Sequence, residues 1–259
     1  MRAMSESSLS EMFTRMRRWH AQPLGSAFAR AEAEVVEAMA PELFGYALLH
    51  VGSIRDRTPM DSGQFRHRFV LSLDANGQQG GALADPAQLP VGNEAVAAVA
   101  LGHVLEFHAN PHQVLREVDR VLVPDGHLLI SGFNPLSLWG ACQAARLRRR
   151  GVPWESDFIG MRRLRDWLAL LNLEVRDVRF FFFRPPFRSS GNLRRAQFME
   201  AIGARWWPKW GAGYVMLAQK RTLPLTPIRP RWRARRDLLG ARVAGPSTRN
   251  LVSPVERRR

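Results

Sequence analysis

Four residues with ligand-binding chemistry follow two apolar stretches in the middle of the chain. Gly102 and His103 come directly after one apolar run, and Phe133 and Asn134 follow another. In α/β proteins the carboxyl ends of neighbouring parallel strands open a crevice in which ligands bind. His103 and Asn134 can each donate and accept hydrogen bonds, and Phe133 offers a ring for stacking. We therefore expect a ligand site here. The alternatives are a packing or helix-capping role for His103 and an ordinary Asn-Pro turn at Asn134.

The two apolar runs and the segment between them predict a strand–helix–strand unit. Residues 96–101 and 127–131 are short and apolar, as strands buried on both faces are. Residues 111–122 carry apolar side chains at spacings of three and four, which predicts a helix with one buried face. Pro-Asp-Gly at 124–126 predicts the following turn, in which the glycine accepts a positive φ. Such units are right-handed and build parallel sheets.

Residues 83–135 resemble the second half of a class I S-adenosylmethionine-dependent methyltransferase with a type 11-like domain. The matching segments read ADPAQLP, ALGHVLEF and REVDRVLVPDGHLLISG, and the last of them is the most specific. The resemblance is weaker over 43–220. It implies an α/β, Rossmann-like fold with a mostly parallel sheet and helices on both faces. It also implies S-adenosylmethionine as the cofactor and methyl transfer to an acceptor as the reaction.

The resemblance implies cofactor contacts at four positions after the second strand. Asp85 stands where the family has an acid that accepts from the adenine amino group, and Pro86 begins the segment that walls the ring. Gly102 and His103 stand at the tip of the fourth strand, where His103 is the one candidate for a catalytic base. Asp85 could instead form only an Asx turn before Pro86. Phe133 and Asn134 are the candidates for contact with the acceptor.

The glycine-rich loop of the family is degenerate in this chain. The predicted first strand, 46–51, is followed by Gly52, Ser53, Ile54 and Arg55, and only Gly52 matches the family's GxGxG pattern. Ile54 is β-branched and disfavours a positive φ, so the loop cannot follow the usual path unchanged. Gly52 and Ser53 remain cofactor candidates. Arg55 could pair with the carboxylate of the cofactor or could be a solvated surface charge.

The second and third strands are closer together in the sequence than the family requires. Residues 65–73 predict the second strand, and 11 positions separate Asp74 from Asp85. A parallel crossover usually takes about a dozen residues or more. The fold is therefore shortened here: either the helix is missing or the two strands are rearranged, for example as a hairpin. Asp74 is then either the ribose-binding acid of the family or only a turn residue.

The chain divides into three expected parts. These are an N-terminal helical extension over 1–40, a methyltransferase-like domain over 41–221 and a basic, disordered tail over 222–259. Residues 26–40 predict a helix, because apolar side chains recur on one face. This helix either lids the cofactor or packs against the edge of the sheet. Residues 1–20 are polar and are expected to fray, unless an apolar stripe within them forms a short helix.

Composition bounds the class of protein and its partners. The net charge is +15, and the tail supplies over half of it with ten arginines and two acids, which favours weak binding of polyanions. Cys142 is the sole cysteine, so no intrachain disulfide forms, as is usual for cytosolic proteins. The sequence has no evident signal peptide and no run of the ~18 apolar residues that a membrane span needs. We expect a cytoplasmic protein.

Two classes of function follow from these observations. The first is an enzyme, a methyltransferase whose acceptor is an unidentified small molecule or RNA. The second is a non-catalytic domain that kept the fold and lost the cofactor. It would act through protein interactions or through nucleic-acid binding by the arginine-rich tail and the tryptophans within 206–210. His108 and His112 have no partner at metal-ligand spacing, so no metal site is predicted.

Overall fold

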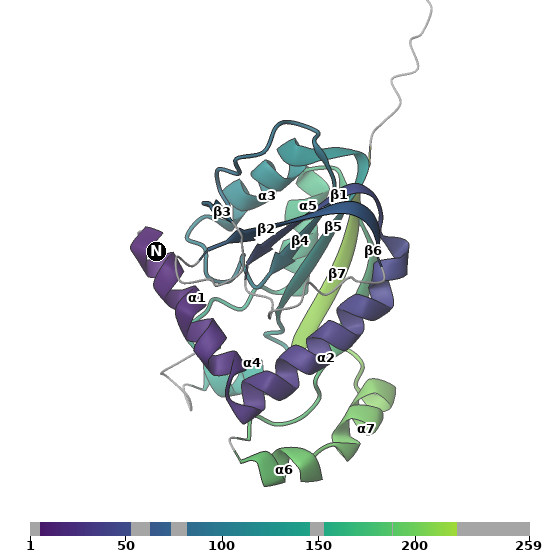
Figure 1. Ribbon diagram of the computed structural model, residues 1–259. Coiled ribbons are helices and arrows are strands. Elements are labelled where there is room, and N and C mark those ends of the chain that lie inside the picture. The colour runs from purple at the N-terminus through teal and green to yellow at the C-terminus, as the bar shows by residue number, and fades with distance from the viewer. Residues whose placement is uncertain (1–5, 53–62, 74–81, 146–152, 188, 222–259) are drawn as a thin grey trace, which may run out of the picture. The chain divides into compact units, whose positions relative to one another are not determined.

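The chain forms one seven-stranded sheet with helices on both sides (Figure 1). A computed structural model describes residues 6–52, 63–73, 82–145, 153–187 and 189–221. The strands are β1 Phe44–Gly52, β2 Gln64–Ser72, β3 Ala82–Leu83, β4 Val96–Gly102, β5 Leu122–Phe133, β6 Leu173–Phe181 and β7 Gly213–Lys220. The helices are α1 Glu6–His20, α2 Pro23–Met39, α3 Pro111–Val121, α4 Leu138–Ala144, α5 Met161–Leu170, α6 Ser190–Arg195 and α7 Phe198–Trp206, with a 3-10 turn η1 at Ala40–Glu42.

The sheet has the order β3-β2-β1-β4-β5-β7-β6. Strands β1 to β5 pair in parallel, and β7 inserts antiparallel between β5 and β6. Helices α1 and α2 run along one side of the sheet, and α3 and α5 lie on the other (Figure 1). The predicted α/β, Rossmann-like fold with a mostly parallel sheet is confirmed.

The unit β4–α3–β5 follows the predicted pattern closely. Asn110 caps α3 by accepting a hydrogen bond from the Gln113 backbone N–H, and Pro111 occupies the first turn, where no intrahelical donor is lost. The buried face of α3 consists of Val114, Leu115, Val118 and Val121. This stripe anchors the crossover between the two strands, so their carboxyl ends are held side by side.

The predicted Pro-Asp-Gly turn differs in detail. Leu122 pairs with Val96, and the next pair across the two strands is His127 with Ala98, so the chain between Leu122 and His127 bulges out within β5. Asp125, rather than the glycine, takes the positive φ, at 59°. Gly126 is required for space instead, since a Cβ there would lie 2.8 Å from a backbone oxygen.

Strands β2 and β3, which are close together in the sequence, pair in parallel. Leu71 pairs with Ala82 and Ser72 with Leu83, both in parallel register. The hairpin alternative is therefore wrong. Asp74 lies in the segment 74–81, outside the described residues, as do 53–62 and the tail 222–259.

The N-terminal segment is a helix rather than a frayed end. From Glu6 onward α1 is regular, and it buries Phe13, Met16 and Trp19 at spacings of three residues. The expected fraying is wrong over this range because the apolar stripe finds a partner. Trp19 packs against Phe28 of α2, with 5.6 Å between ring centroids. The two helices thereby form one layer over the sheet.

Candidate functional site

The carboxyl ends of β1, β4 and β5 form the edge at which a cofactor would lie. Gly52 ends β1 beside Gly102, which ends β4, and Ser131 of β5 is the next neighbour. Gly52 has a φ of +111°, and a Cβ there would meet the Gly102 carbonyl oxygen at 2.4 Å. Only glycine fits this position. Ser53 and Arg55 lie outside the described residues, so their cofactor contacts stay predictions.

Asp85 lies just after β3, in the loop that leads to β4. Its Oδ1 accepts a hydrogen bond from the Ala87 backbone N–H at 2.8 Å, and His108 Nε2 lies 3.3 Å from the same oxygen. An Asx turn before Pro86 is therefore present. The Asp85 side chain is still 31% exposed, so the turn does not exclude contact with a ligand.

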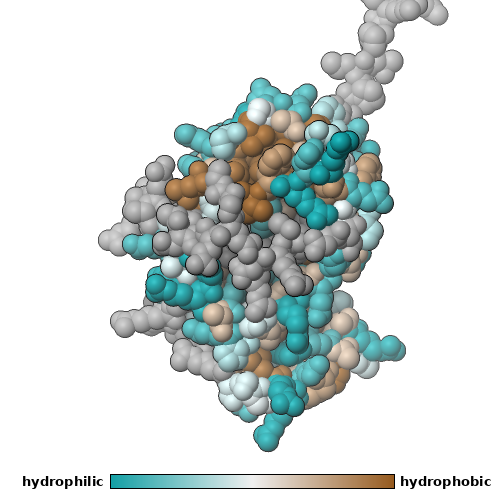
Figure 2. Space-filling model, in the orientation of Figure 1, coloured by the Kyte–Doolittle hydropathy of each residue, from teal (hydrophilic) through white to brown (hydrophobic). Residues whose placement is uncertain are grey.

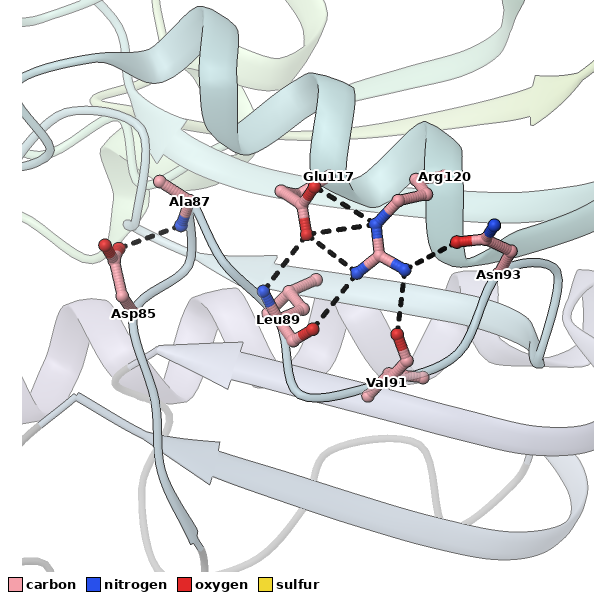
Figure 3. Close-up of polar contacts among 7 residues, drawn as sticks. All are labelled: Asp85, Ala87, Leu89, Val91, Asn93, Glu117 and Arg120. Carbon is pink, nitrogen blue, oxygen red and sulfur yellow. Dashed lines mark hydrogen bonds and ion pairs between the residues drawn. The ribbon is translucent and has the colours of Figure 1, made fainter.

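Arg120 of α3 fixes the loop that carries Asp85 (Figure 3). Its guanidinium donates to the carbonyl oxygens of Leu89 at 3.0 Å and Val91 at 2.9 Å, and it pairs with Glu117 at 2.8 Å. Glu117 in turn accepts from the Leu89 backbone N–H at 3.1 Å. The hydrogen bond from Arg120 lowers the pKa of Glu117. Both charges thus hold the loop against α3.

The role of Arg120 was missed from the sequence, although both partners stand in the most specific matching segment, REVDRVLVPDG. The spacing of Glu117 and Arg120 by three residues indicates an ion pair on one helix face. Nothing local shows that the pair also binds a loop about 30 residues earlier in the chain.

His103 is the centre of a buried ionic cluster. Its φ is +54° and its side chain has no exposed surface. Nδ1 lies 2.9 Å from Glu106 Oε2, and Nε2 lies 3.4 Å from Glu32 Oε1 of α2. The ring also packs on Phe133, with 4.3 Å between centroids. The cluster therefore joins α2 to the carboxyl ends of β4 and β5.

The cluster holds His103 in its charged form. Burial alone lowers the pKa of His103, but attraction to Glu32 and Glu106 and the hydrogen bond with Glu106 raise it to about 10. Burial opposes ionisation of Glu32 as well, yet His103 keeps the pKa of Glu32 below its ordinary value. For Glu106, burial outweighs the attraction to His103, so its pKa is raised. At neutral pH, His103 is a cation.

Glu106 is a buried carboxylate at the carboxyl edge of the sheet. Its side chain is 1% exposed, and Oε1 accepts a hydrogen bond from the Phe133 backbone N–H. The Glu106 carboxylate thus links His103, after β4, to Phe133 at the end of β5.

The two candidate acceptor residues are both buried in this structure. Phe133 has no exposed surface, and its ring packs against Phe28 at 5.2 Å. The Asn134 amide donates to the carbonyl oxygens of Lys209 and Gly211, at 2.9 and 2.8 Å. Asn134 thereby ties the end of β5 to the segment before β7. A contact of either residue with an acceptor stays a prediction.

No group of three His, Cys, Asp or Glu side chains is placed to hold a metal ion in the part of the chain that the structure describes. Within the same residues, no helix combines the length and the apolar character that crossing a membrane requires.

Known proteins share this fold and sequence pattern. The methyltransferase domain family matches residues 67–130. The uncharacterized protein YafS of Escherichia coli K12 is 32% identical over 208 residues, which are 80% of this chain and 82% of YafS. The ubiquinone biosynthesis O-methyltransferase of Xanthomonas oryzae pv. oryzae is 30% identical over 169 residues, 62% of each chain.

Solved structures agree at the level of the fold. A Haloferax volcanii complex of the Trm112 methyltransferase activator with a methyltransferase gives a TM-score of 0.57 at 13% identity, covering 85% of this chain and 99% of that one. A SAM-dependent methyltransferase from Thermotoga maritima gives 0.56 at 16% identity, covering 84% and 100%.

The fold and the edge of the sheet define a class I, Rossmann-like methyltransferase domain. Residues 67–130 match the methyltransferase domain family, in line with the resemblance in the sequence, and over most of its length the chain is a relative of YafS. The cofactor of this family is S-adenosylmethionine.

Proposed function

We propose that the chain transfers the methyl group of S-adenosylmethionine to an oxygen of a small-molecule acceptor. One observation carries the proposal: Asp85 is partly exposed at the carboxyl edge of the sheet, on a loop that Arg120 and Glu117 hold in place. Four polar contacts hold the loop: Arg120 donates to Leu89, Val91 and Asn93, and Glu117 accepts from the Leu89 N–H. The oxygen acceptor is suggested by the O-methyltransferase of Xanthomonas.

The residues of the edge fit the adenosine half of the cofactor. A carboxylate that is already held by the Ala87 N–H can accept a further hydrogen bond from an adenine amino group through its second oxygen. Pro86 follows as an apolar wall for the ring. Gly52, at the end of β1, has no side chain, so its backbone lies close to β4 and stays open to a ligand. Asp85, Pro86, Gly52 and Gly102 are therefore the residues that we assign to cofactor binding.

The bound cofactor supplies an activated methyl group, so the protein needs to align the acceptor rather than provide a nucleophile. His103 is a poor candidate for a general base in this arrangement. A base must be neutral to take up a proton, whereas the two carboxylates keep His103 protonated at neutral pH. We assign His103 a positioning role: it holds α2 and Phe133 at the edge of the sheet.

The proposal is tested by methyl transfer from tritium-labelled S-adenosylmethionine to a panel of small phenols and catechols, with bulk RNA as a separate acceptor. We expect label in a small-molecule product with the wild type, and at least tenfold less with Asp85→Asn. Label in RNA alone would show that the acceptor is a nucleic acid rather than a small molecule. Cofactor binding without any transfer across the panel would contradict the oxygen-acceptor assignment, and absence of cofactor binding would favour the non-catalytic alternative.

A further inference from the structure

The segment between β6 and β7 exposes a cluster of large apolar side chains. We call Phe198, Ile202, Trp206, Trp207 and Trp210 the aromatic face; Trp206 is 70% and Trp210 60% exposed. Figure 1 places α6 and α7 at the bottom of the view, and Figure 2 shows apolar surface there next to hydrophilic residues. Exposed apolar clusters of this kind mark surfaces that bind a partner or a membrane.

The outward orientation of the aromatic face is fixed by contacts on the inner side of α7. Glu200 Oε2 accepts from the Phe183 backbone N–H at 3.0 Å, and Oε1 accepts from Arg184 Nε at 2.8 Å. Gly203 lies so close to Phe183 that a Cβ would meet its ring at 2.5 Å. The helix thus turns its one acid and its glycine inward. Phe198, Ile202 and Trp206, four residues apart, face solvent, the reverse of an ordinary surface helix.

An apolar pocket opens beside the aromatic face. Its volume is about 420 Å³, and its lining includes Leu138, Phe183, Phe198, Met199, Trp207 and Trp210. The volume lies within the range of about 300–1,000 Å³ typical of small-molecule sites. No charged side chain lines it. The pocket therefore suits a hydrocarbon chain better than a polar ligand.

The charge around the aromatic face is positive. Arg194, Arg195, Arg205 and Lys209 are exposed on the same segment. The one acid among residues 189–211 is Glu200, whose charge Arg184 already balances. Tryptophan beside lysine and arginine is the composition of protein surfaces that lie in the headgroup region of a bilayer. Cations of this kind are attracted to an anionic lipid surface.

We propose that the aromatic face binds the surface of an anionic phospholipid bilayer, with its tryptophans at the headgroup level and the pocket receiving an apolar chain. The observations favour lipid over a protein or a nucleic acid. The exposed arginines and lysine around the face complement an anionic lipid surface, and stacking on single-stranded RNA does not require an uncharged pocket. The proposal does not depend on methyl transfer.

The first test is sedimentation of the full chain with vesicles of phosphatidylglycerol and phosphatidylethanolamine, against vesicles of phosphatidylcholine. We expect binding to the anionic vesicles and at least a tenfold weaker partition for the triple variant Trp206→Ser, Trp207→Ser, Trp210→Ser. Leu170→Ser is the matched control, because Leu170 is 81% exposed on α5, on another part of the surface. This control should bind as the wild type does.

Two double variants test the contribution of the positive charges to binding. Arg205→Gln with Lys209→Gln should weaken binding to anionic vesicles several-fold, whereas Arg162→Gln with Arg165→Gln on α5 should not. Because the basic tail is present in every variant, its contribution to binding is the same throughout. Equal loss in both charge variants would show that net charge alone drives binding and would overturn the proposal.

The second test reads the position of the tryptophans directly. Brominated acyl chains quench tryptophan fluorescence at short range, and Trp19, Trp139, Trp154 and Trp167 are buried in the protein. Because Trp232 lies in the basic tail, all quenching variants carry Trp232→Phe. We expect quenching in Trp232→Phe, and none when the triple substitution is added to it. Quenching that this combined variant retains, or binding of single-stranded RNA that the triple variant loses while vesicle binding is unchanged, would contradict the lipid assignment.

Discussion

The two halves of the sheet are built differently. Strands β4 and β5 are buried along most of their length and are joined by α3, whose apolar stripe packs on them. On the β1–β2 side, Phe44, Tyr46 and Phe69 are each more than half exposed. Figure 2 shows apolar surface in the upper part of the view, where Figure 1 places β1 and β2. Eleven residues, 53–63, join β1 to β2, fewer than the dozen or more that are usual for a parallel crossover.

The difference shows what a crossover helix contributes. Where the helix is present, it covers the strands and holds their carboxyl ends in register. On the β1–β2 side the strands still pair in parallel, but Phe44, Tyr46 and Phe69 stay exposed. The cofactor edge draws on both halves, with Gly52 from one and Gly102 and His103 from the other. We therefore expect mutations to be costly at the buried positions of β4, β5 and α3 and tolerated at the exposed positions of β1 and β2.

The largest effect is expected from the buried ionic cluster. His103→Gln leaves the carboxylates of Glu32 and Glu106 buried without their counter-charge. Removing one partner of a buried ion pair costs about 3–5 kcal/mol of unfolding free energy. His67→Gln, at an exposed position of β2, should cost less than about 0.5 kcal/mol. Urea denaturation measures both, and similar costs for the two would remove the distinction between the halves.

The same cluster predicts a pH dependence of stability. Because the pKa of His103 is raised from 6.5 to about 10 by Glu32 and Glu106, the folded chain binds more protons than the unfolded chain between these values. The stabilisation by His103 is therefore complete below pH 6.5 and is lost as pH rises through 10. We expect the denaturation midpoint of the wild type to fall over this range by more than that of His103→Gln. Parallel pH profiles would show that His103 is not charged in the folded state.

A core substitution compares the two halves without charges. Leu115→Ala removes a fully buried side chain of α3 and should cost about 2–5 kcal/mol. Phe69→Ala removes a larger side chain from β2, but 53% of it is already exposed, so we expect less than about 1 kcal/mol. Chemical denaturation checks the pair. A larger cost at Phe69 would mean that residues outside the described ranges cover this face.

Arg120→Lys should have a smaller effect on stability and a selective one on cofactor binding. Lysine keeps the charge but cannot donate at once to Leu89, Val91 and Glu117, so the loop that carries Asp85 loosens. We expect a loss of about 1–3 kcal/mol in binding, from two lost hydrogen bonds. The control is Arg116→Lys, exposed on the same helix. Unchanged affinity for Arg120→Lys would show that the loop does not depend on Arg120.

Periodic patterns in the sequence were enough to predict most of the fold. The spacing of Val114, Leu115 and Val118 gives α3, and the apolar runs give β4 and β5, because local burial patterns decide these elements. The turn within β5 shows the limit: Pro-Asp-Gly was identified, but which residue takes the positive φ is set by pairing with Ala98 across the sheet.

The site was predicted less completely, because its contacts join distant parts of the chain. The buried cluster around His103 depends on Glu32, which α2 places next to the His103 ring. Glu32 lies 71 positions before His103 in the sequence, so no local pattern indicates the contact. The fraying expected for residues 1–20 failed for the same reason, since the stripe in α1 packs on distant parts of the chain, namely Phe28 of α2, Phe107 and Phe133. Asp85 was identified through its flanking segment, which the family resemblance supplied.

The most direct test of the account is calorimetric titration of the chain with S-adenosylmethionine, with Asp85→Asn and the control Asp125→Asn alongside. Asp125 lies on β5 in the bulge that follows α3, away from the carboxyl edge. We predict micromolar binding by the wild type and the control, and a loss of about 1.5–3 kcal/mol, roughly 10–150-fold, in Asp85→Asn. Wild-type affinity in Asp85→Asn, or no binding by the wild type at millimolar cofactor, would contradict the central claim that Asp85 and the edge of β1 and β4 form a cofactor site.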